Sequence, residues 1–350
     1  MEKSVPTPPK DTIHCLRVSF PKDDPKSAEY YGRMLSPLME MSLPPESRSQ
    51  PFHAETETFF LPDVLVSRAS NSACHLDRHA RTIARSASDD LMLVNYLGGA
   101  VRFSVGGGWH DVHMDLGAFL VFDLSRELHI RIETMRNIGV ILSRRRLETL
   151  VPFLDDAHGL QFKPGALNAI LLGLLEQVAA MGPRITISEA RTVSDLITRT
   201  VAGAIGECLA ENARQAGSPG LAPLPAIKAA IERRLEDPEL SPSVLTEEFG
   251  LARSTLYRLF EPMGGVAAYI RERRLRLAFR LITGQQADKP RVSQLAFTLG
   301  FSHPSAFTRA FKEKYGLSPS EAATLSSHPE EVSAPFILTE EARPYLKHLV

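Results

Sequence analysis

The same pattern of residues occurs twice in the last third of this 350-residue chain. Residues 240–260 read LSPSVLTEEFGLARSTLYRLF, and residues 291–311 read RVSQLAFTLGFSHPSAFTRAF. With Gly250 aligned on Gly300, each copy has a short apolar segment, a glycine, an apolar residue and a second segment that ends in Arg-x-Phe. Glycine suits the left-handed backbone of a tight turn between helices. One copy would also fit a plain helical hairpin, but two matching copies predict two helix-turn-helix units.

A long helix is predicted between the two copies. Residues 266–282 are rich in Arg and Leu, with Tyr269, Ile270, Leu277 and Leu281 on the apolar side. At ~1.5 Å per residue this helix spans roughly 25 Å, so we expect the second helices of the two units to lie about one duplex turn, ~34 Å, apart. One protomer could then read two successive major grooves. The positive charge of this region agrees with binding to DNA. Residues 224–325 hold 15 Lys and Arg against 11 Asp and Glu, whereas the whole chain has a net charge of −1.

The exposed side of each second helix supplies the candidate DNA contacts, opposite the apolar residues of that helix. An arginine can read guanine through two hydrogen bonds, and it can also bind phosphate alone. The predicted DNA-binding residues are Arg253, Ser254, Tyr257, Arg258, His303, Ser305, Thr308, Arg309 and Lys312.

The chain is expected to divide at residues 212–223, which contain two glycines and two prolines without apolar periodicity. This linker predicts an N-terminal domain over residues 1–211 and a DNA-binding domain over residues 224–326. Residues 327–350 form a C-terminal tail whose role the sequence leaves open.

Short alternating segments predict a β-sandwich or barrel in the N-terminal domain. Gly98-Gly99 and Gly106–Gly108 are expected to form hairpin turns. The aromatic residues Tyr96, Phe103, Trp109 and Phe119 are expected in the core, and such residues could also line a ligand cavity. The predicted strands are Phe59–Ser67, Leu91–Leu97, Ala100–Val105, Trp109–Met114, Ala118–Phe122, Leu128–Met135 and Ile138–Leu142.

Two amphipathic helices follow the strands, over residues 165–181 and 188–211. Their apolar stripes must be buried against each other, against the β-unit, or against a second subunit. The pattern leaves intramolecular packing and dimerisation open.

Residues 224–325 resemble the C-terminal domain of the AraC/XylS family of bacterial transcription regulators. The resemblance is carried by Ala-Tyr-Ile-Arg-x-x-Arg-Leu at residues 268–275, Leu-Gly-Phe-Ser at 299–302, Phe-Thr-Arg-Ala-Phe-Lys at 307–312 and Gly-Leu-Ser-Pro at 316–319. Chains of this family usually close soon after the Ser-Pro helix, whereas this one continues from Ser326 to Val350.

The resemblance implies an α+β fold class: an N-terminal cupin-like β-barrel or sandwich with an α-helical hairpin, followed by an all-α tandem helix-turn-helix domain. Residues 1–211 would then be an effector-binding and dimerisation domain. The implied function is a sequence-specific DNA-binding regulator, an effector-responsive activator that binds double-stranded DNA, a small-molecule effector and RNA polymerase as a homodimer.

No catalytic constellation is found, so the chain is expected not to be an enzyme and to need no cofactor or metal. His110 and His113 are three residues apart and would face opposite sides of a strand, which does not make a metal site. Cys74, His75 and His79 are read as an ordinary loop. The alternatives are an enzyme or repair protein with an appended helix-turn-helix domain, which would require a nucleophilic cysteine or a metal site, and a regulator without an effector.

The N-terminus lacks an apolar signal-peptide core, and no apolar run reaches the ~18–20 residues of a membrane span. Cys15, Cys74 and Cys208 are far apart and odd in number, which fits free thiols in a reducing cytosol. We therefore expect a cytoplasmic protein without a membrane partner.

Overall fold

Residue contacts divide the chain into two units. The short segment Ala80–Ser88 belongs to the second unit, although the residues before and after it in the sequence belong to the first. The computed structural model describes residues 11–36, 38–86, 88–112, 118–151, 154–215, 224–283 and 291–327. The first unit holds the described residues up to His79 and those from Asp89 to Ala210. The second unit holds Ala80–Ser88 and the described residues from Glu211 onward.

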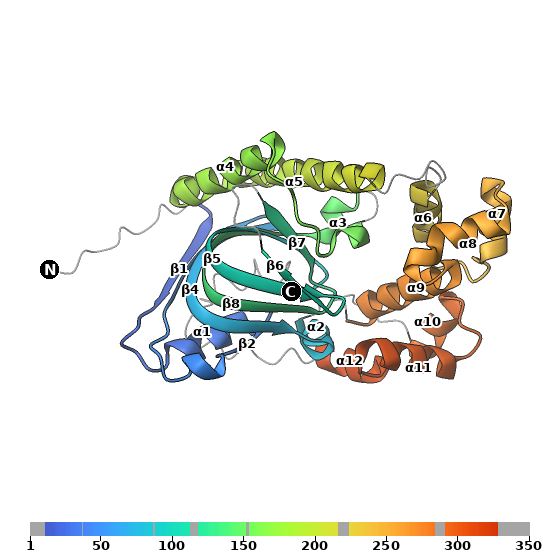
Figure 1. Ribbon diagram of the computed structural model, residues 1–350, viewed down its shortest axis with the longest axis horizontal. Coiled ribbons are helices and arrows are strands. Elements are labelled where there is room, and N and C mark those ends of the chain that lie inside the picture. The colour runs from blue at the N-terminus through green and yellow to red at the C-terminus, as the bar shows by residue number, and fades with distance from the viewer. Residues whose placement is uncertain are drawn as a thin grey trace. The chain divides into compact units, whose positions relative to one another are not determined.

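An eight-stranded antiparallel sheet forms the framework of the first unit, with its main path in the order β1-β3-β4-β8-β5-β6 (Figure 1). The off-path strands β2 and β7 pair with β4 and β5. Strands β4 and β5 are long enough for each to pair with two shorter strands along one edge, β3 and β2 on β4, and β7 and β6 on β5. The strands are β1 (His14–Phe20), β2 (Glu40–Ser42), β3 (Ala54–Leu61), β4 (Val64–Arg78), β5 (Leu91–Val105), β6 (Gly108–Asp111), β7 (Phe119–Asp123) and β8 (Leu128–Leu142).

The two predicted glycine turns have different outcomes. Gly106 and Gly107 have φ angles of 66° and 93° between β5 and β6, so the predicted hairpin is confirmed there. Gly98 and Gly99 lie inside β5, where the pairing with β8 shifts register between Tyr96 and Gly98, so the prediction of a turn at this point was wrong. A β-carbon at Gly99 would stand 2.7 Å from the carbonyl carbon of Thr134. Gly98 and Gly99 therefore allow a β-bulge in β5 and the close approach of β8.

Other strand predictions were wrong in their boundaries. The segment Phe59–Ser67 turns at Pro62-Asp63 and supplies β3 and β4, whereas the predicted break at Arg136-Asn137 lies within β8. The segment Trp109–Met114 ends as β6 at Asp111, and its last two residues, His113 and Met114, lie outside the described residues. Strands β1 and β2 were not predicted at all.

Helices α4 (Ala166–Met181) and α5 (Ile187–Gln215) lie along one face of the sheet, as Figure 1 shows, joined by the 3-10 turn Gly182–Arg184. They confirm the two predicted amphipathic helices, but α5 continues to Gln215, so the predicted linker boundary at residue 212 was wrong. Leu171, Leu175 and Ile205 pack with Phe59 and Val140 of the sheet in one hydrophobic cluster. The opposite face of the sheet packs with α1 (Ser27–Leu35) in a second cluster that includes Phe60 and Phe122. The first unit also contains α3 (Arg144–Leu147) and the 3-10 turns Pro45–Ser47 and Leu154–Ala157.

Buried charge in this unit was not foreseen from the sequence. Arg144 is only 2% exposed, and its Nη2 lies 2.6 Å from the carboxylate of the buried Asp123. Burial acts to raise the pKa of Asp123, but the charge of Arg144 and a hydrogen bond from Ser125 hold it well below its ordinary value. Arg144 is therefore a core ion pair rather than part of a basic surface.

The second unit is entirely helical in its described residues. Its helices are α2 (Ala80–Ser86), α6 (Leu224–Arg233), α7 (Pro242–Phe249), α8 (Arg253–Phe260), α9 (Val266–Thr283), α10 (Val292–Thr298), α11 (Pro304–Tyr315) and α12 (Pro319–Ser327), with a 3-10 turn at Glu261–Met263. Figure 1 shows α7 and α8 near one end of α9, and α10 and α11 near the other. The predicted fold class, an antiparallel-sheet domain followed by a tandem helix-turn-helix domain, is thus confirmed.

Helix α2 comes from the connection between β4 and β5 but packs in the second unit. Ile83 and Ala84 of α2 are buried in a cluster with Phe279 of α9, Phe311 of α11 and Ala322 of α12. This segment was predicted to belong to the N-terminal domain, because its seven residues carry no signal that they pack against helices 180 or more positions away, from Val266 onward. The second hydrophobic core therefore contains residues from both halves of the sequence.

Candidate nucleic-acid interface

The two helix-turn-helix units are built by the same local geometry. Gly250 and Gly300 follow α7 and α10 with φ angles of 60° and 69°, in the left-handed region that favours glycine. The next residue returns a backbone hydrogen bond to its helix in both copies, from Leu251 to Thr246 and from Phe301 to Ala296. The predicted turns are therefore present in both units.

Each second helix is held by its predicted apolar residues. In α8, Leu256 and Phe260 are fully buried, and Phe260 meets Tyr269 of α9 edge-on at 5.1 Å between ring centroids. In α11, Phe307 and Phe311 are fully buried and lie against each other. These contacts fix which side of α8 and α11 remains exposed.

The side of α8 away from its core carries four of the predicted residues. Arg253, Ser254, Tyr257 and Arg258 are all exposed. The guanidinium of Arg253 stacks on the Tyr257 ring at 5.4 Å from the ring centroid. This stacking pre-orders both side chains while they remain accessible to a ligand.

The other five predicted residues lie along α11 and at its start. His303 precedes the helix, and Ser305, Arg309 and Lys312 are exposed on it, while Thr308 is half-buried. Pro304 occupies the first helical position, where its missing N–H costs nothing. The N-cap residue of α11 is His303, with an extended backbone.

Two arginines of α9 form ion pairs within the domain, whereas Arg271 of the same helix is exposed. Arg273 is 5% exposed and binds both carboxylate oxygens of Glu232, at 2.6 and 2.7 Å. Arg276 and Lys314 both pair with Glu272. These ion pairs join α6, α9 and α11.

By contrast, Arg258, Arg309 and Lys312 form no ion pair with any described residue, and all three are exposed. The second helix of each unit therefore carries exposed positive charge that has no ion-pair partner among the described residues. The sequence-predicted residues form two patches, one on α8 and one on α11.

Sequence reasoning missed Arg274 and its neighbourhood. Its guanidinium donates to the carbonyl oxygens of Leu235 and Asp237, at 3.1 and 2.7 Å, and also lies against Gly300. Burial lowers the pKa of Arg274, and Asp237 partly offsets that effect. Arg274 thus ties the first helix-turn-helix unit to the turn of the second, a role that no local pattern signals.

A cavity of about 620 Å³ lies on the sheet of the first unit. Its walls are of mixed charge, with Arg17, Arg68 and Arg136 facing Glu55 and Glu176 among the lining residues. The aromatic residues considered for a cavity are elsewhere: Tyr96, Phe103 and Phe119 are buried in the core, as expected, but Trp109 is 44% exposed, so a core position was wrong for it. Trp109 stacks instead with Arg131 on the surface.

Comparison with known proteins agrees with this geometry. Residues 245–324 match the family model described as a helix-turn-helix domain. The chain is 40% identical over 91 residues to LumQ of Photobacterium leiognathi, named a probable transcriptional regulator, and 29% identical over 102 residues to the transcriptional activator RhrA of Rhizobium meliloti. These matches cover 25% and 29% of this chain and 35% and 32% of the relatives, so they span about a third of the relatives' length.

The fold of a larger part of the chain resembles a solved structure, the AraC-like transcriptional activator CuxR. The TM-score is 0.51 at 21% identity, with 76% of this chain and 95% of CuxR covered. The predicted resemblance to the AraC/XylS family is confirmed by the helix-turn-helix domain in sequence and by CuxR in fold. The two relatives are regulators by name.

One stretch, Ala166–Arg184, is long and apolar enough by length and composition to cross a membrane, although Asn168 and Glu176 interrupt its apolar residues. Its Leu171, Leu175 and Val178 are buried against the sheet, as in a core helix of a globular domain.

Proposed function

We propose that this chain, whose C-terminal domain is a helix-turn-helix domain of the AraC type, is a transcriptional regulator that binds double-stranded DNA. Helices α8 and α11 enter two successive major grooves, and Arg253, Ser254, Tyr257, Arg258, His303, Ser305, Thr308, Arg309 and Lys312 contact the duplex. Arg258 and Arg309 read guanines, and Lys312 binds phosphate.

A single observation carries this proposal. Arg273 and Arg276 of α9 and Lys314 of α11 are held in internal ion pairs, whereas Arg258 of α8 and Arg309 and Lys312 of α11 are exposed and have no ion-pair partner among the described residues. Exposed, unpaired positive charge on the second helix of both units suits a polyanion that contacts both helices, and duplex DNA has that form.

Binding of the full chain to a duplex selected from a random pool tests the proposal. The affinity should fall as salt rises, and Lys312→Ala should reduce the slope of log K against log salt by about 1, since each phosphate contact contributes about 0.9. Arg33→Ala, which removes an exposed arginine of α1 in the sheet unit, is the matched control and should leave the slope unchanged. Selection that yields no enriched duplex would contradict the proposal.

We also propose that the sheet unit binds a small polar effector in the cavity lined by Arg17, Arg68 and Arg136. Its volume of about 620 Å³ suits a metabolite-sized ligand. Arg17 and Arg68 both pair with Glu57, whereas Arg136 forms no ion pair with a described residue and is the free cation for an anionic group. A thermal-shift screen of metabolites against the parent and Arg136→Ala would identify a ligand whose stabilisation depends on this residue.

A homodimer through α4 and α5 is proposed on a separate observation. Ile170 and Leu196 are 62% and 53% exposed, although the buried side of each helix is already packed on the sheet. Exposed apolar side chains on both helices suit a second copy of the chain.

We further propose that the chain activates transcription through RNA polymerase in the cytoplasm, and this part of the proposal rests on the family resemblance. A regulator without an effector remains the alternative, and the screen distinguishes the two.

A further inference from the structure

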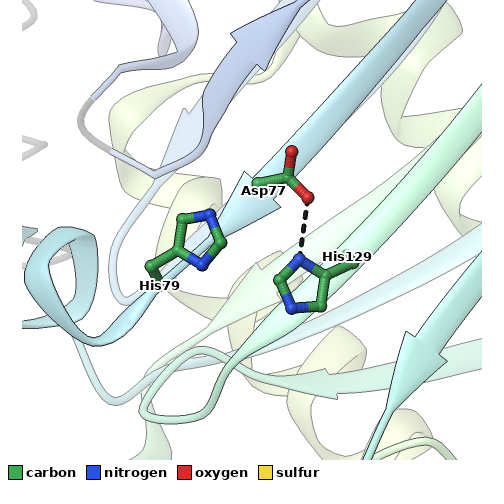
Figure 2. Close-up of side chains that lie close together, drawn as sticks. All are labelled: Asp77, His79 and His129. Atoms are coloured by element: carbon green, nitrogen blue, oxygen red, sulfur yellow. Dashed lines mark hydrogen bonds and ion pairs between the residues drawn. The ribbon is translucent and has the colours of Figure 1, made fainter. Parts of the chain in front are cut away.

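Two histidines and an aspartate meet on the sheet unit at the ends of two neighbouring strands. Figure 2 shows Asp77 and His79, from the end of β4, facing His129 of β8. Asp77 and His129 are directly opposite each other in the strand pairing. His79 follows Asp77 by two residues, the spacing that brings side chains to the same side of an extended chain. One possible ligand atom from each residue lies within 4.8 Å of the others.

The spacing of these atoms suits a shared ion. Nδ1 of His129 lies 2.7 Å from Oδ1 of Asp77. Two ligands bound at ~2.0–2.1 Å in tetrahedral geometry are about 3.3 Å apart, so small side-chain rotations would admit an ion between them. The rings of His79 and His129 are 5.1 Å apart between centroids. The site is accessible, since His79 is exposed and His129 and Asp77 keep 30% and 18% of their side-chain surface.

Imidazole and carboxylate together select a particular class of metal. Neutral histidine suits Zn²⁺ and its first-row neighbours, whereas Mg²⁺ and Ca²⁺ prefer oxygen ligands throughout. Three protein ligands leave a further position for water. We propose that Asp77, His79 and His129 form a binding site for a divalent first-row transition-metal ion such as Zn²⁺. The proposal is independent of the DNA-binding function.

The positive charge of the neighbouring Arg131 would oppose the binding of a metal ion at this site. Arg131 donates to the same Oδ1 of Asp77 at 2.8 Å, and so places a positive charge beside the ligands. Arg131 is also held by the carbonyl of Ile130 and by the Trp109 ring. Without a metal, the cluster would be a surface network in which Arg131 and His129 both satisfy Asp77. The two interpretations differ in what the loss of Arg131 does to metal affinity.

The position of the site in the chain gives it a structural consequence. His79 directly precedes Ala80, where α2 begins, and α2 supplies Ile83 and Ala84 to the hydrophobic core of the helical unit. A metal ion bound by His79 would fix the backbone at the start of this segment.

Isothermal titration of the full chain with Zn²⁺ tests the proposal. The parent should bind one ion, and His79→Ala should weaken binding by at least about 10–100-fold, the loss that even an outer-shell partner causes. Because His79 is exposed, this variant should keep its fold, which circular dichroism without metal checks. His110→Ala removes an exposed histidine of β6 as the matched control and should leave the affinity unchanged.

A second variant separates a metal site from a salt-bridge network. Arg131→Gln should bind Zn²⁺ more tightly, because the competing cation is removed, and Co²⁺ should give the visible absorption of a low-symmetry nitrogen and oxygen site that His79→Ala abolishes. The proposal is overturned if the parent shows no saturable Zn²⁺ binding, or if His79→Ala and His110→Ala have equal effects.

Discussion

The guanidinium of Arg274 fills the space that a side chain at Gly300 would occupy. A β-carbon at Gly300 would stand 2.7 Å from Cζ of Arg274, which is anchored by its hydrogen bonds to Leu235 and Asp237. The equivalent residue of the first unit, Gly250, has nothing within 4 Å of such a carbon. Position 300 therefore requires glycine for two reasons, the left-handed backbone and the close approach of Arg274. Position 250 requires glycine only for the left-handed backbone.

This pair of glycines gives a matched test of how Arg274 joins the two units. Gly250→Ala should cost about 1–2 kcal/mol from left-handed strain alone, and Gly300→Ala should cost more because Arg274 must also move. In an Arg274→Ala background, the cost of Gly300→Ala should fall to that of Gly250→Ala. Hydrogen exchange of the α7 and α8 amides measures the cost of Gly250→Ala, and that of the α10 and α11 amides measures the cost of Gly300→Ala. Equal costs for both glycines in the parent would argue against the contact.

Helix α2 should stabilise the helical unit although it is remote in sequence. Ile83→Ala removes a side chain that is 1% exposed and should lower the stability of that unit by about 2–5 kcal/mol. Ile187→Ala, at a side chain that is 57% exposed, should change stability little. A fragment of residues 224–327 lacks α2 and should be less protected from hydrogen exchange in α9 and α12 than the full chain. Equal protection would show that α2 contributes nothing there.

Acid should weaken the link between α9 and α11. Burial acts to raise the pKa of Glu272, but the charges of Arg276 and Lys314 lower it to about 2, from an ordinary value of 4.5. A depressed carboxyl pKa contributes stability that is present above pH 4.5 and is lost as the pH falls toward 2. Glu272 is 41% exposed, so solvent screening makes the contribution small. Urea midpoints measured across this range should fall less steeply for Glu272→Gln than for the parent, and parallel curves would exclude the effect.

Self-association should depend on the exposed side of α5. Leu196→Asp should give a folded monomer in sedimentation where the parent is a dimer, because Leu196 is 53% exposed. Ile205 is fully buried, so Ile205→Asp should unfold the sheet unit instead. A parent that sediments as a monomer, or a Leu196→Asp variant that remains a dimer, would rule out this interface.

The sequence predicted what local patterns encode. The helix-turn-helix units followed from the repeat around Gly250 and Gly300, and the exposed positions of α8 and α11 followed from helical spacing. The bulge at Gly98-Gly99 was mistaken for a turn because glycine serves both structures. Contacts between distant segments had no local signal, which is why α2, the Arg274 anchor and the meeting of Asp77 with His129 emerged only from the fold.

Footprinting of the full chain on its selected duplex tests the central claim most directly. If α8 and α11 read successive major grooves, Arg258→Ala and Arg309→Ala should each relax base preference at a different half of the site, about one helical turn apart. Each lost guanine contact should cost about 1–3 kcal/mol. Loss at one common position, or unchanged base preference in both variants, would contradict the account.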